Sequence, residues 1–61
     1  MNIVELENGV WLAPWDGDPG RTLRIENAKT FASFKDAEDA LKMAREWRQF
    51  VEARILPKPA P

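Results

Sequence analysis

The residues able to do chemistry gather in one short stretch, the loop of residues 14–20 and the segment that follows it. Asp16 and Asp18 form a close carboxylate pair there, and Asp-x-Asp opens the calcium loop of helix–loop–helix sites. The calcium pattern then fails, because Gly20 stands at its fifth position and Asn27 at its twelfth, where a bidentate Glu is required. Paired carboxylates also hydrolyse glycosides, but Asp is equally typical of a solvated turn. We therefore predict no metal site.

Arg21 and Arg24 suggest a second chemistry, the binding of an anion. A glycine-rich loop followed by Arg can present backbone N–H groups and a guanidinium to phosphate. The loop has neither the Gly-Lys-Ser/Thr nor the Gly-x-Gly-x-x-Gly pattern, and its own Asp16 and Asp18 would repel phosphate. Pairing of Arg21 with one of these carboxylates is the alternative.

The sequence lacks the residues that a nucleophilic catalytic triad needs. The chain contains no Cys, no His and no Tyr, and its one Ser, Ser33, is better placed as a helix cap. A catalytic triad needs a nucleophile, a base and an orienting group. We expect no enzyme activity and no cofactor.

Trp15 is the best candidate for a binding contact. Trp11 and Trp47 fall on positions predicted to be buried, whereas Trp15 lies in the Pro/Gly loop with nothing obvious to cover it. Trp and Arg are enriched at the energetic centres of protein interfaces. The alternative is that Trp15 folds back over the small core. The predicted partner-binding residues are Trp15, Asp16, Asp18, Arg21 and Arg24.

A β-hairpin over residues 3–13 should position this loop. Asn8-Gly9 between two apolar runs predicts a type I′ turn, because both central residues of that turn need positive φ. The turn predicts that Glu7 lies opposite Val10 and that pairing continues without interruption.

The uninterrupted register divides the hairpin into two faces, because side chains alternate along a strand. The face expected on the core carries Val4, Leu6, Trp11 and Ala13. The opposite face leaves three apolar residues outside, a pattern typical of a protein contact. The predicted self-association residues are Ile3, Val10 and Leu12.

The rest of the chain predicts a third strand over residues 21–26, one helix, and a last strand over residues 50–56. Ser33 is the expected N-cap, with Asp36 three residues later. Phe31 is expected to enter the core ahead of the helix. The expected buried stripe of the helix is Phe34, Ala37, Leu41, Ala44, Trp47 and Val51.

These elements predict a single α+β domain over residues 1–56, a small antiparallel sheet packed on one face by one amphipathic helix. Residues 57–61 are Pro-rich and are expected to form a disordered tail. With 61 residues and no disulfide, the domain is expected to be marginally stable, so its extra stability should come from good internal packing or from self-association as a homodimer.

Charge and hydropathy restrict the partners. Nine basic residues against ten acidic ones give a net charge of −1, which disfavours nucleic acid. We expect no membrane-spanning segment, because no apolar run approaches the roughly 20 residues that one needs. The N-terminal residues do not look like a secretory signal. A cytoplasmic protein is therefore expected.

The string from Gly9 to Thr22, followed by Glu26-Asn27-Ala28-Lys29-x-Phe31 and an Ala/Leu/Arg-rich helix, resembles short phage- and prophage-encoded proteins. Several such proteins inhibit bacterial anti-phage defence by binding a defence protein or by sequestering its nucleotide signal. The resemblance implies an accessory protein in the cytoplasm of a host cell. It assigns a role to no particular residue.

Three functions remain open at this point. The first is a non-catalytic inhibitor that binds a host defence protein. The second is a sponge for a small anionic ligand such as a cyclic nucleotide, held by Arg21, Arg24 and Trp15. The third is a small nucleic-acid-associated regulator.

Overall fold

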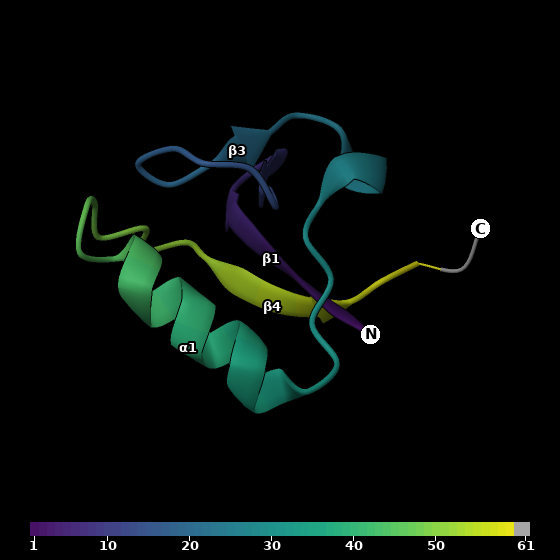
Figure 1. Cartoon of the computed structure of the whole chain (residues 1–61). Helices are drawn as coiled ribbons and strands as arrows, with labels where there is room; N and C mark the ends of the chain where they lie inside the picture. The colour runs from purple at the N-terminus through teal and green to yellow at the C-terminus, as the bar shows by residue number, and fades with distance from the viewer. Residues whose placement is uncertain (60–61) are drawn as a thin grey trace.

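The computed structural model describes residues 1–59 and contains a four-stranded antiparallel sheet and one α-helix, so the predicted α+β class is confirmed (Figure 1). The strands are β1 (Asn2–Glu7), β2 (Val10–Leu12), β3 (Arg21–Thr22) and β4 (Arg54–Pro57). The helices are the 3₁₀ turn η1 (Ile25–Asn27) and α1 (Phe34–Ala44). The sheet order is β3-β2-β1-β4, so β1 joins the N-terminal hairpin to the C-terminal strand.

A β-bulge in the hairpin changes the predicted register. Glu7 lies opposite Val10 as expected, but the register shifts between Glu5 and Glu7, so Glu5 lies opposite Trp11. A bulge places two residues of one strand against one of the other, which moves the following residues to the opposite face. Leu12 therefore joins the side of the sheet that the helix covers, and Trp11 points to the other side.

The core consequently has two parts, one on each face of the sheet. The larger part lies under α1 and consists of Val4, Leu6, Leu12, Phe31, Ala37, Leu41, Ala44 and Phe50. The smaller part consists of Ile3, Trp11 and Ala28, with Ile25 and Leu56 packed against it. In Figure 1, η1 and α1 lie on different sides of β1, so the segment around η1 covers the face that the helix leaves open.

The predicted self-association face is therefore wrong. Ile3 is fully buried under the η1 segment, Leu12 is buried under α1, and Val10 alone of the three keeps partial exposure. The prediction failed because it assumed an uninterrupted register and a sheet covered on one side only. Ile3 and Leu12 are therefore not exposed on this surface for contact with a second copy.

The helix begins where the sequence predicts. Ser33 is the N-cap, and its Oγ accepts a hydrogen bond of 3.1 Å from the backbone N–H of Asp36. Ala37, Leu41 and Ala44 are buried as expected.

The helix ends earlier than its apolar pattern suggests, and the rest of the predicted stripe is wrong. The helix stops at Ala44, and the chain turns through residues 45–47, so Trp47 and Val51 are exposed rather than buried. Phe34, the first helical residue, is exposed as well. Phe50 instead enters the core, with a left-handed backbone φ of 46°.

The third strand is shorter than predicted. β3 contains two residues, and Ile25–Asn27 form the 3₁₀ turn where the alternating pattern predicted strand. Phe31 does reach the core, and its backbone N–H and C=O both bond to Asn2, which extends the sheet beyond the end of β2.

The last strand is confirmed in place but not in length. β4 covers Arg54–Pro57 rather than residues 50–56, and its register with β1 runs from Asn2 opposite Pro57 to Glu5 opposite Arg54. The Lys58 N–H donates a 2.8 Å hydrogen bond to the Met1 carbonyl. The ordered chain thus continues past the predicted domain boundary at residue 56, while residues 60 and 61 of the predicted tail lie outside the described residues.

Candidate functional site

An open groove is lined by the loop of residues 14–20 and the C-terminal end of α1. Figure 1 shows these two segments on the same side of the molecule. The volume of the groove is about 550 Å³. We call it the tryptophan groove. It is lined by residues 12–20 with Lys29, Ala40, Met43, Ala44 and Trp47.

Three large apolar side chains of the tryptophan groove face solvent. Trp15 is 50% exposed, Trp47 59% and Met43 66%. Two of them come from the end of the helix and one from the loop, about thirty positions away in the chain. The groove therefore concentrates apolar surface that the core does not use.

The loop holds Trp15 by a close backbone contact. The Ala13 N–H donates a 2.9 Å hydrogen bond to the Gly20 carbonyl, which closes the base of the loop. A Cβ on Gly20 would lie 1.9 Å from the Trp15 carbonyl oxygen, so this position requires glycine. The Asp18–Pro19 peptide bond within the loop is cis.

Met43 and Trp47 are exposed at the C-terminal end of the helix, whose buried side consists of Ala37, Leu41 and Ala44. Met43 precedes the buried Ala44 and turns away from the sheet. Trp47 follows the helix in a turn, where its N–H donates a 3.0 Å hydrogen bond to the Ala44 carbonyl. The expectation that Trp47 belongs to the core is therefore wrong.

The loop side of the tryptophan groove carries negative charge. Asp16 and Asp18 both line it and are exposed, and neither forms an ion pair with any residue in 1–59. Lys29 also lines the groove, and its ammonium group lies 5.4 Å from the centre of the Phe31 ring. The pairing of Arg21 with Asp16 or Asp18, which the sequence offered as the alternative to an anion site, is absent among the described residues.

The other two predicted partner-binding residues lie elsewhere. Arg21 lines a different depression of about 340 Å³, together with Arg48. Arg24 pairs with Glu26 at 2.7 Å, and this hydrogen bond lowers the pKa of the Glu26 carboxyl. Of the five predicted residues, the structure brings Trp15, Asp16 and Asp18 together and leaves Arg21 and Arg24 outside their groove.

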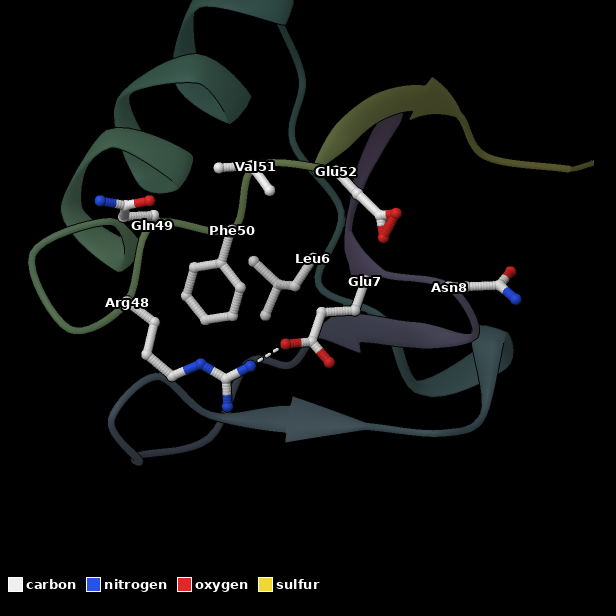
Figure 2. Close-up of a pocket in the computed structure, with 8 residues that line it drawn as sticks. All are labelled: Leu6, Glu7, Asn8, Arg48, Gln49, Phe50, Val51 and Glu52. Carbon is white, nitrogen blue, oxygen red and sulfur yellow. Dashed lines mark hydrogen bonds and ion pairs between the residues drawn. The ribbon is translucent and has the colours of Figure 1, made fainter.

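A further depression of about 390 Å³ lies between the hairpin turn and residues 48–52 (Figure 2). The Arg48 guanidinium lies 5.1 Å from the centre of the Phe50 ring and forms an ion pair with Glu7, as Figure 2 shows. The Arg45 Nε donates to the Gln49 carbonyl at 3.1 Å, which holds the turn before Phe50. The Arg48 charge is thus matched within this depression.

Glu5 is the one buried charged residue of the described part, and its surroundings stabilise the charged form. Arg54 donates two hydrogen bonds to its Oε1, at 2.6 and 3.0 Å, and the Gly9 N–H donates to Oε2 at 3.3 Å. The Arg54 hydrogen bonds, followed by that of Gly9, lower the pKa of the Glu5 carboxyl. A carboxylate held ionised in this way stabilises the sheet and is a poor proton donor at neutral pH.

Within residues 1–59, no group of three or more Asp or Glu side chains is arranged to hold a metal ion. No helix in the same residues has the length and apolar character needed to cross a bilayer.

Sequence reasoning found the loop half of the tryptophan groove and missed the helix half. Met43 carried a signal, because it interrupts the polar side of the helix next to the apolar stripe. Trp47 carried none, since its spacing matches a buried position as long as the helix is assumed to continue. Comparison with known proteins finds no match to a family model, to a curated sequence or to a solved structure.

Proposed function

We propose that this protein acts by binding a partner protein in the tryptophan groove and carries out no chemistry of its own. One observation supports this most directly: Trp15, Met43 and Trp47 are all at least half exposed around a single groove. Exposed apolar patches on small proteins mark contact sites. Tryptophan in particular is enriched among the residues that dominate interface energetics.

The partner we propose is a protein of the host cell, and specifically one that acts in anti-phage defence. This part of the proposal rests on the resemblance of the chain to short phage-encoded proteins. Occupation of a functional surface of the defence protein would be enough to inhibit it. The lack of Cys, His and Tyr agrees with an inhibitor that works by binding alone.

The test compares retention of a host protein on immobilised wild-type protein and on three single variants, Trp15→Ala, Trp47→Ala and Leu23→Ala. Leu23 is the matched control, since it is 78% exposed but does not line the groove. Truncation of a side chain that dominates an interface costs about 2 kcal/mol or more of binding free energy, or roughly 30-fold in affinity. We expect both Trp variants to lose the retained protein and Leu23→Ala to keep it.

Folding controls separate lost binding from lost structure. Because both Trp side chains are at least half exposed, the variants should keep the wild-type far-ultraviolet circular dichroism spectrum. Equal retention by all three variants would contradict the proposal. Unfolding of Trp15→Ala would show that Trp15 serves the core.

A second candidate, the sequestration of a small anionic ligand, is favoured by one observation. Arg21 and Arg48 line the same depression beside the exposed Leu23, although Glu7 already pairs with Arg48. A ligand at 100 times its dissociation constant stabilises a protein by about 2.7 kcal/mol. A rise in melting temperature with a cyclic nucleotide, abolished by Arg21→Ala, would establish this function, and a protein-binding inhibitor should show no such rise.

A further inference from the structure

We infer, resting on the proposed function, that the partner segment in the tryptophan groove is basic as well as apolar. An apolar side chain of the partner lies between Trp15 and the helix end. A neighbouring Lys or Arg of the same segment meets Asp16 and Asp18. The ligand class is thus a short protein segment with an apolar anchor beside a positive charge.

The loop wall of the groove is negatively charged. Asp16 and Asp18 line the groove in the same loop as Trp15, and neither has an ion-pair partner within residues 1–59. The one cation that lines the groove, Lys29, has its ammonium group 5.4 Å from the Phe31 ring centre. A partner therefore meets two carboxylates at the loop wall, and complementary charge across an interface decides which partner binds.

The shape of the groove suits a segment of a longer chain. About 550 Å³ lies within the range of sites that enclose a small ligand, but this groove is open along its length. An open groove with apolar walls fits side chains of a segment that continues beyond it on both sides. Trp15 and Trp47 supply rigid aromatic surfaces, and the flexible Met43 adapts to the side chain between them.

Ligands of the opposite charge do not suit the groove. A phosphate or an acidic peptide would be repelled by the carboxylates of Asp16 and Asp18, which both follow Trp15 in the loop. A nucleic acid carries its negative charge along its whole length and meets the same obstacle. The tryptophan groove and the Arg21 depression therefore suit different ligands.

The experiment is a selection from a random library of twelve-residue peptides displayed on yeast, performed on three forms of the folded protein. These are the wild type, a charge variant with Asp16→Asn and Asp18→Asn, and Trp47→Ala. Peptides from the wild-type selection are then synthesised, and their affinities are measured at 50 mM and 500 mM salt.

We expect wild-type selection to enrich peptides in which Leu, Met, Phe or Trp stands within two positions of Lys or Arg. Exposed charge pairs are worth little individually, so each lost carboxylate should weaken binding about 2- to 5-fold at low salt. High salt should remove most of the difference between the wild type and the charge variant. The Trp47→Ala form should bind none of the selected peptides.

The outcomes distinguish this inference from the proposed function. Apolar peptides without a basic preference, bound equally by the charge variant, would overturn the inference and leave the groove as the binding site. Peptides bound equally by Trp47→Ala would overturn both. A wild-type dimer in sedimentation that Trp47→Ala converts to a monomer would also overturn the inference, because a second copy would then occupy the groove.

Discussion

Gly20→Ala places a methyl group at the base of the loop, where the backbone of Trp15 leaves no room for it. An ideal Cβ on Gly20 would lie 1.9 Å from the Trp15 carbonyl oxygen, and real Cβ atoms essentially never approach another atom closer than 3.0 Å. The difference of 1.1 Å is the least distance by which the two groups must separate. Since the atom in the way belongs to the backbone, a side-chain rotation cannot relieve the contact.

The expected loss of stability can be taken from overpacked sites in other proteins. Forced backbone shifts cost about 1–3 kcal/mol. A domain of this length has a total stability of roughly 3–9 kcal/mol. With a urea dependence of about 1 kcal/mol per molar, the unfolding midpoint should fall by about 1–3 M. Trp15 should move with its own carbonyl group, so the loop wall of the tryptophan groove should be displaced.

The assay is urea unfolding followed by circular dichroism, with indole fluorescence to report on the groove. Gly9 provides the control, because its φ is +78° and a Cβ there would meet nothing within 4 Å. Gly9→Ala should cost about 1 kcal/mol through its backbone conformation, and Gly9→Asn should cost less because Asn tolerates positive φ. At Gly20, Asn should be no better than Ala, since both carry a Cβ. A Gly20→Ala protein with the wild-type midpoint and fluorescence would refute the reasoning.

Three further perturbations test other parts of the structure. The Arg54 hydrogen bonds lower the folded-state pKa of Glu5 below its ordinary 4.5. The ionised Glu5 carboxylate therefore stabilises the fold above pH 4.5, and this contribution is lost as the pH falls from there. In the Glu5→Gln variant, the free energy of unfolding should depend less on pH in the acid range. Leu41→Ala removes a buried side chain and should cost about 2–5 kcal/mol in urea unfolding, whereas the exposed Val51→Ala should cost under about 0.5 kcal/mol. Ser33→Ala removes the helix cap and should cost about 0.5–2 kcal/mol, which Ser33→Asp should largely restore; equal stability of the Ala and Asp variants would argue against the cap.

The parts of the fold that sequence reasoning predicted correctly are coded by neighbouring residues. The Asn8-Gly9 turn closes the hairpin where predicted, but it is not the predicted type I′ turn, because Gly9 has a positive φ of 78° and Asn8 does not. Ser33 caps the helix by accepting a hydrogen bond from Asp36, three positions later in the chain. Each of these signals is complete within four residues, so its meaning does not depend on the rest of the chain.

The errors arose where a local pattern was extended beyond its range. The prediction assumed that inward and outward side chains alternate through Leu6 without a break. The bulge instead places Trp11 on the side of the sheet predicted for Leu12, and Leu12 on the side predicted for Trp11. An exchange of faces is favourable here because both sides of the sheet bury apolar residues. Periodicity alone cannot reveal the second buried side, because Ile25 and Ala28, which cover Ile3 and Trp11 there, come from a separate segment.

For the candidate site too, the sequence predicted one part and missed the other. The sequence by itself determined that a Pro/Gly loop carries Trp15 next to Asp16, and that the chain contains no Cys, His or Tyr. Only the tertiary structure decided that the helix stops at Ala44 and that Met43 and Trp47 face this loop. The physical reason is that a turn or a cap depends on a few adjacent residues, whereas the exposure of a tryptophan depends on which distant segments have already filled the core.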